Sequence, residues 1–125
     1  MGDRTIYRFE EVAWHVPTAP GTDPKQAEDA GKQGAARKLL AQGDGGFYTQ
    51  VVQIPPNFEV PMHSHSHSEI FMVLEGRCSF DGEEMEQYDM TVVPEHGVYG
   101  FTAGPEGVRF LVMRTGAASY AGAPS

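Results

Sequence analysis

The sequence has little from which to build a disulfide framework, a membrane span or a nucleic-acid surface. Cys78 is the only cysteine of 125 residues, so no intrachain disulfide can form, and we read it as a packing residue in a cytoplasmic protein. No run approaches the ~20 apolar residues of a membrane helix, and the first residues lack the apolar core of a secretory signal. Nine basic residues face seventeen acidic ones, a net charge of −8, which disfavours phosphate binding. We therefore expect no nucleic-acid partner and no membrane partner.

Turn-forming residues are abundant. Fifteen glycines and nine prolines suit many short strands joined by turns, and 125 residues fit one domain. Alternating and apolar runs predict strands at residues 36–40, 47–54, 70–74, 77–80, 84–87, 90–93, 97–102 and 108–113. We expect an N-terminal arm and long polar loop over residues 1–34, an all-β barrel over 35–114, and a flexible C-terminal tail over 115–125. The loop at 18–34 is either functional or disordered, with room for a turn or two of helix at 24–30.

Three of the five histidines fall within five positions, and a carboxylate follows them: His63, His65, His67 and Glu69. Histidines two apart lie on one face of a strand, so their imidazoles can converge, and with a carboxylate they suit Fe, Mn, Ni, Zn or Cu. A straight strand would place His63 about 20 Å from Glu69, so the chain must turn between them. We predict that His63, His65 and Glu69 hold one divalent transition metal, while His67 lies in the turn, beside the metal or solvated. The alternative is a solvated histidine-rich loop that binds metal adventitiously.

This segment resembles the first motif of the cupins, Gly-x5-His-x-His-x3-4-Glu-x6-Gly. His63, His65, Glu69 and Gly76 match the spacing, and Asn57 stands in place of the first glycine. Asn tolerates the left-handed backbone angles that glycine adopts better than most residues do. The resemblance covers roughly residues 35 to 114, and it implies a single-domain jelly-roll β-barrel with a metal (Fe, Mn, Ni or Zn) inside its mouth.

The second cupin motif, Gly-x5-Pro-x-Gly-x2-His-x3-Asn, is degraded. Pro94 anchors the alignment, and Tyr88 and His96 replace the two glycines, while Ala103 replaces the asparagine. Tyr99 stands where the resemblance places the last metal-binding histidine. Three arrangements stay open: Tyr99 ligates, His96 swings in, or the three ligands of the first motif suffice.

Tyr99 and His96 are the candidate catalytic residues. A phenol beside a metal can act as a general acid or base, whereas the alternative is that Tyr99 only fills space. Gln50 and Gln53 lie on opposite faces of one strand, so one of them can line the pocket. Arg109 either binds an anionic substrate or forms an exposed ion pair.

The resemblance implies a metal-dependent enzyme that acts on a small oxygenated organic molecule. The chemistry would be that of a dioxygenase, or that of a lyase or isomerase in which the metal is a Lewis acid. The alternative is a non-catalytic module that binds a metal or a small ligand. Residues 70–74 and 110–113 are apolar on both faces, which predicts cover by a partner, most simply in a homodimer, or by the N-terminal arm.

Overall fold

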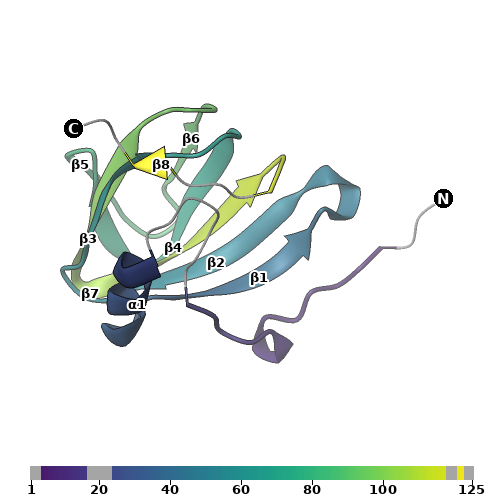
Figure 1. Cartoon of the computed structure of the whole chain (residues 1–125), viewed down its shortest axis with the longest axis horizontal. Helices are drawn as coiled ribbons and strands as arrows, with labels where there is room; N and C mark the ends of the chain where they lie inside the picture. Colours follow the sequence, from purple (N-terminus) through teal and green to yellow (C-terminus); the bar gives the residue numbers. More distant parts are fainter. Residues whose placement is uncertain (1–3, 17–23, 118–120, 123–125) are drawn as a thin grey trace.

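The computed structural model describes residues 4–16, 24–117 and 121–122, and it confirms the predicted all-β jelly-roll barrel (Figure 1). The elements in chain order are η1 (Phe9–Glu11), α1 (Pro24–Lys32), β1 (Ala36–Gln42), η2 (Asp44–Gly46), β2 (Tyr48–Ile54), β3 (Glu59–Ser64), β4 (Glu69–Phe80), β5 (Glu83–Met85), β6 (Met90–Val93), β7 (Tyr99–Arg114) and β8 (Ala121–Gly122).

Two long antiparallel strands, β4 and β7, run through both layers of the barrel (Figure 1). Residues 69–76 of β4 pair with residues 108–114 of β7, and residues 78–80 pair with residues 101–103. β2, β1 and β6 complete the first layer, whereas β3, β5 and β8 complete the second. The two layers therefore share a pair of strands, which closes the sandwich along one side.

Each shared strand bends between the layers at a glycine. Gly76 and Gly107 have positive φ angles of 71° and 81°, and the β4–β7 register shifts next to Gly76. A Cβ on Gly76 would collide with the carbonyl oxygen of Gly107, so the two backbones approach more closely than any other residue allows. The predicted breaks at residues 75–76 and 103–107 are wrong for this reason: glycine bends these strands and does not end them.

The core lies between the layers and is rich in phenylalanine. Phe71 is fully buried, and its ring centroid lies 4.3 Å from that of Phe110 and 5.1 Å from that of Phe80. Val73 and Val112 are also buried on the inward-facing alternate positions. Burial of each such side chain contributes roughly 1.5–3 kcal/mol, so this cluster holds the layers together.

The N-terminal arm covers the outer face of β1. His15 and Arg37 exchange two backbone hydrogen bonds of 2.8 Å. Lys38 points outward from the barrel, yet it is buried because the arm covers it. Its Nζ donates to the Phe9 carbonyl oxygen at 2.7 Å. The same Nζ lies 3.8 Å from the Phe9 ring centroid and 5.0 Å from that of Trp14. The arm thus packs on β1, and cover of the doubly apolar residues 70–74 and 110–113 by the arm stays a prediction.

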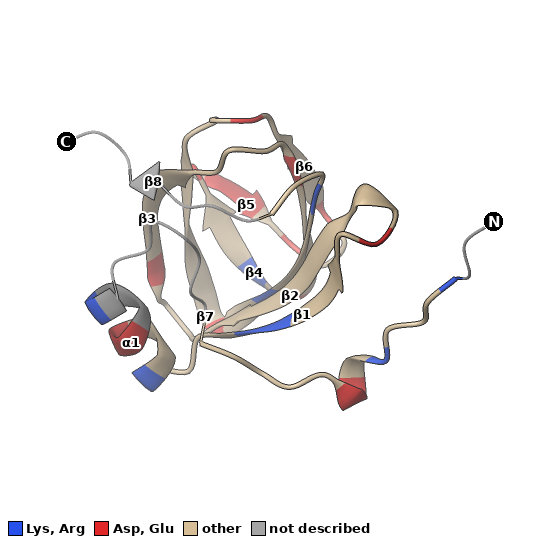
Figure 2. Ribbon diagram, turned by 45° about the vertical axis from the view of Figure 1, so that its right-hand side comes forward, with Lys and Arg blue, Asp and Glu red and all other residues tan. Residues whose placement is uncertain are grey.

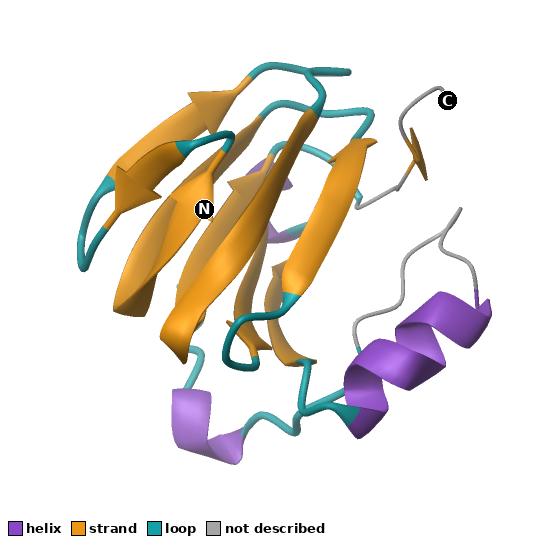
Figure 3. Cartoon of the chain, turned by 90° about the vertical axis from the view of Figure 1, so that its left-hand side faces the viewer, coloured by secondary structure: helices purple, strands orange, loops and turns teal. Residues whose placement is uncertain are grey.

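Parts of the predicted loop and tail are ordered elements. α1 lies beside one end of the barrel (Figure 3). β8 pairs with His63 and Ser64 on β3, so this part of the tail joins the barrel. Acidic positions are distributed over α1, β5 and several turns (Figure 2). The helices of the described part are too short and too polar to cross a membrane.

Candidate functional site

Strand register gathers five polar or aromatic side chains at one end of the barrel. β3 ends just after His63, and β4 begins at Glu69. The first residue of β7, Tyr99, pairs with His63, and its last residue, Arg114, pairs with Glu69. We call this group the mouth cluster: His63, His65, Glu69, Tyr99 and Arg114.

His63 is held as a neutral imidazole. Its side chain is buried, and Nδ1 lies 2.8 Å from the Pro61 carbonyl oxygen. A carbonyl oxygen only accepts, so Nδ1 carries the hydrogen and Nε2 is the atom that a ligand would reach. Burial lowers the pKa of His63, which favours the neutral form, and the hydrogen bond to Pro61 acts in the opposite direction. His65 lies beside it with ring centroids 4.9 Å apart and ring planes at 82°.

Glu69 forms a buried ion pair with Arg114. Oε2 of Glu69 lies 3.0 Å from Nη2 of Arg114, and the side chains are only 1% and 5% exposed. The contact is close but not aligned as a hydrogen bond. Among the described residues, neither oxygen of Glu69 nor Nε of Arg114 has a hydrogen-bond partner of good geometry. The Tyr99 hydroxyl also interacts with both groups, so the pair is stabilised by its opposite charges and by this phenol.

Tyr99 points into the barrel between His63 and this ion pair. Its ring centroid lies 4.4 Å from that of His63, and its ring stacks on Phe80 at 5.0 Å with an interplanar angle of 13°. Burial raises the pKa of Tyr99 well above its usual value; Glu69 raises it further, and Arg114 acts in the opposite direction. Tyr99 is thus a neutral phenol near pH 7, able to donate a proton and poorly suited to ligate as a phenolate.

The predicted three-ligand metal site is not formed in this arrangement. His63 and His65 have the chemistry and proximity of metal ligands. Within residues 4–16, 24–117 and 121–122, however, no three His, Cys, Asp or Glu side chains are grouped closely enough to hold an ion. Glu69 contacts a guanidinium instead, and a divalent cation beside Glu69 would meet the positive charge of Arg114. The side chains as they lie do not fit the metal, and the ligand assignment remains a prediction.

Sequence reasoning missed Arg37 and Arg114. Nη1 of Arg37 donates to Oε1 of the buried Gln50 at 3.1 Å, on the inward face of β1 and β2. Burial lowers the pKa of Arg37, and the positive charge of Arg114 lowers it further. The available signal was the alternation that places Arg114 on the same face as the apolar residues 108, 110 and 112.

His67 and His96 do not join the mouth cluster through their rings. The His67 ring packs against Gly116, where a Cβ would collide with it, and its Nδ1 lies 2.9 Å from Oγ of Ser66. The side chain of His96 is exposed, while its backbone N–H donates to the His65 carbonyl oxygen at 2.8 Å. His96 thus helps to position His65, and its predicted catalytic role stays a prediction.

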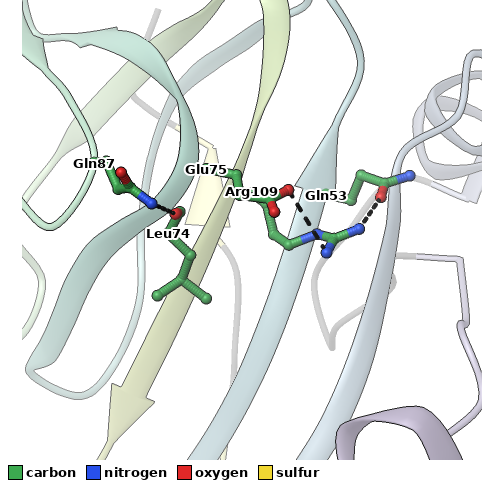
Figure 4. Close-up of polar contacts among 5 residues, drawn as sticks. All are labelled: Gln53, Leu74, Glu75, Gln87 and Arg109. Carbon is green, nitrogen blue, oxygen red and sulfur yellow. Dashed lines mark hydrogen bonds and ion pairs between the residues drawn. The ribbon is translucent and has the colours of Figure 1, made fainter.

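Arg109 lies on the outer face and forms the ion pair that the sequence left as an alternative (Figure 4). Nη1 lies 3.7 Å from Oε2 of Glu75, and Nη2 donates to Oε1 of Gln53 at 3.0 Å. Gln53 therefore faces outward and Gln50 inward, as predicted for one of the two. Arg109 and Glu75 line a groove of about 540 Å³. Gln87 donates to the Leu74 carbonyl oxygen at 3.1 Å in the same view.

Comparisons with known proteins agree with this architecture. The polyketide cyclase RemF from Streptomyces resistomycificus superposes with a TM-score of 0.71 at 21% identity, covering 100% of this chain and 87% of that chain. An RmlC-like cupin from Shewanella frigidimarina gives 0.68 at 18% identity, covering 90% of both chains. A chain from the structures of the DMSP lyases RdDddP and RnDddQII gives 0.72 at 18% identity, covering 90% and 63%. No curated protein matches the chain.

At these identities the structural likeness shows the fold alone. The family is shown by a sequence model described as a cupin domain, which matches residues 50–113 and so more than half of the chain. That range contains the whole mouth cluster except Arg114. The chain belongs to the cupin family.

Proposed function

We propose that the chain is an enzyme that converts a small oxygenated organic molecule at the mouth of the barrel, by the proton transfer typical of lyases and isomerases. The observation that carries this proposal is the position of Tyr99, a buried neutral phenol between an imidazole and an ion pair. Proteins named as a polyketide cyclase and as DMSP lyases are among those with a similar fold, which supports the class of reaction but not a substrate.

Each residue of the mouth cluster has a distinct part in this chemistry. Tyr99 donates its phenolic proton to an oxygen of the ligand on which negative charge develops. The guanidinium of Arg114 stabilises that charge, and Glu69 holds Arg114 in place. His63, being neutral, accepts a proton at Nε2. Phe80 fixes the plane of the phenol by stacking.

Replacement of the phenol tests the proposal. We expect Tyr99→Phe to keep the fold and to lose turnover by about two to four orders of magnitude, because only the transferable proton is removed. Hydroxyketones and diketones are incubated in deuterated buffer, and NMR follows both substrate loss and deuterium uptake at carbon. Tyr88→Phe is the matched control, since Tyr88 is 68% exposed. Turnover that is unchanged in Tyr99→Phe would remove Tyr99 from the mechanism.

Metal-dependent chemistry is the second candidate, favoured by the adjacent rings of His63 and His65. Elemental analysis of the purified chain tests it. If the predicted ligand set holds, His63→Ala and Glu69→Ala each abolish stoichiometric metal, and His67→Ala does not. Full occupancy in the first two variants contradicts that set. Redox-active iron together with oxygen uptake supports a dioxygenase. A purified chain that contains no metal and shows no turnover supports the non-catalytic binding module.

We also propose that the chain forms a homodimer through the outer face of the first layer. Ile70 and Leu111 are half-buried there, and Ile70 pairs in register with both Met113 and Val92, which is 62% exposed. Light scattering at micromolar concentration should give a dimer that Val92→Glu dissociates. Met62→Glu, on the other layer and 46% exposed, is the control. A monomer across that range rejects the proposal.

A further inference from the structure

The turn between β4 and β5 contacts the backbone next to Tyr99. β4 pairs with β7 up to Phe80, and the chain then turns away at Asp81 and Gly82, whose φ angles are 49° and 85°. Asp81 still makes two hydrogen bonds to Gly100 of β7. Its backbone N–H donates to the Gly100 carbonyl oxygen at 3.1 Å, and its Oδ1 accepts the Gly100 N–H at 3.0 Å. One side-chain oxygen thus extends the β4–β7 pairing to the residue that follows Tyr99.

The side-chain oxygen is what distinguishes Asp81 from a glycine at this turn. In a two-residue hairpin turn with positive φ at both central positions, Asn, Asp and Gly are the favoured residues. Glycine adopts a φ of 49° at least as readily as Asp81 does, because it has no Cβ. Glycine has no oxygen, however, that could accept the Gly100 N–H. The effect of the hydrogen bond can therefore be separated from the effect of the turn conformation.

Gly100 is held from its other side by β3. A Cβ on Gly100 would lie 3.0 Å from the backbone nitrogen of Met62, closer than side chains normally approach a neighbouring strand. The preceding residue, Tyr99, pairs with His63 in the same β3–β7 register. With β3 on one side and Asp81 on the other, the backbone of residues 99–100 is fixed from both edges.

We propose that Asp81 is a positioning residue for Tyr99. Its Oδ1 fixes Gly100 and thereby sets the direction in which the phenol enters the barrel. Phe80, the residue before Asp81, stacks on the Tyr99 ring at 5.0 Å, so two consecutive residues hold the ring and the adjoining backbone. A misplacement of about 1 Å can lower the rate of a reaction about a hundredfold. The inference rests on the proposed function, because it adds a residue on which proton transfer by Tyr99 depends.

NMR measures the position of the phenol without a substrate. The tyrosine rings are labelled with ¹³C, and the Tyr99 signal is identified by its loss in Tyr99→Phe. Asp81→Gly should shift that signal, because it removes the oxygen and suits the turn. Asp81→Asn should restore it, because an amide oxygen also accepts an N–H. Asp89→Gly is the matched control, since Oδ2 of Asp89 accepts the Glu86 N–H at 2.8 Å in a different turn, between β5 and β6.

Three results of this measurement would overturn the proposal. The first is a Tyr99 signal that stays in place in Asp81→Gly. The second is a shift that Asp81→Asn does not restore, and the third is an equal shift in Asp89→Gly. Circular dichroism verifies that each variant is folded.

Kinetics distinguish positioning of the phenol from support of the fold alone. With the hydroxyketones and diketones that test the proposed function, Asp81→Gly should lower kcat about ten- to a hundredfold at unchanged KM. Asp81→Asn should recover most of this loss, and Asp89→Gly should change neither constant. A loss of stability to urea in Asp81→Gly without a loss of kcat would reduce Asp81 to a turn residue and contradict the proposal.

Tyr99→Phe separates this inference from the proposed function. In that variant, Asp81→Gly should cost no further turnover, because the proton that the backbone directs is already absent. If Asp81→Gly shifts the Tyr99 signal but Tyr99→Phe keeps full turnover, the proposed function fails and the positioning of the phenol stands. If turnover requires Tyr99 but Asp81→Gly changes neither the signal nor kcat, the positioning fails and the proposed function stands.

Discussion

Removal of the negative charge of Glu69 is the sharpest perturbation of the mouth cluster. Glu69→Gln keeps the shape of the side chain but leaves the guanidinium of Arg114 buried without its counter-ion. At the observed separation of 3.0 Å, and with an effective dielectric constant of about 20, the gross attraction is about 5–6 kcal/mol. Removal of one partner from a buried pair costs about 3–5 kcal/mol. That is a large part of the roughly 5–15 kcal/mol that stabilises a whole domain.

Urea unfolding of four proteins measures this effect: wild type, Glu69→Gln, Arg114→Gln and the double variant. We expect the double variant to lose less than the sum of the two single losses, because the second substitution removes a charge that is already unpaired. The exposed pair of Lys32 and Glu28 on α1, 3.2 Å apart, provides the control. Glu28→Gln should change the free energy of unfolding by no more than about 0.5 kcal/mol, because water screens that pair.

Two results would refute this reasoning. The first is a loss in Glu69→Gln as small as that in Glu28→Gln. The second is strict additivity of Glu69→Gln and Arg114→Gln. A different result would support the metal site that the sequence predicts. In that case the loss of unfolding free energy in Glu69→Gln would not add to that in His63→Ala, and a chelator would abolish it.

Two further predictions concern the core and the bend. Burial raises the pKa of the Cys78 thiol from 9.0 to about 11, so the folded chain keeps a proton that the unfolded chain releases. The stability that the protonated Cys78 thiol contributes is complete below pH 9 and is lost as pH rises to about 11. Urea titrations should lose about 2–3 kcal/mol across that window, and Cys78→Ala should remove this slope; an identical slope would contradict it. Gly76→Ala should destabilise by more than about 2 kcal/mol in the same assay, because its Cβ meets the Gly107 carbonyl oxygen. Gly82→Ala, with a φ of 85° but open space around it, should cost about 1 kcal/mol, and equal losses would refute the steric argument.

Local patterns were enough to predict the all-β fold and several of its turns. Alternation and turn residues predicted the strands, because a half-buried strand needs one apolar face. Asn57, Tyr88 and His96 stand at the glycine positions of the two cupin motifs, and all three adopt positive φ angles, of 59°, 71° and 62°. Each of the three turns thus keeps the positive φ angle of a glycine although another residue stands there. The spacing of His63 and His65 likewise predicted that their rings lie together, although β3 ends at Ser64 and His65 lies just beyond it.

The partner of Glu69 depended on the tertiary structure. The carboxylate could turn toward His63 and His65 nearby in the chain, or toward a residue brought beside it from a distant strand. The β4–β7 register places Arg114 opposite Glu69, and in a dry interior a guanidinium at 3.0 Å is a strong partner for a carboxylate. Arg37 reaches the same interior only because β1 and β7 flank β2. The sequence names the groups that can carry charge, but strand register decides which charges meet, because electrostatic attraction depends on distance in space and not on separation along the chain.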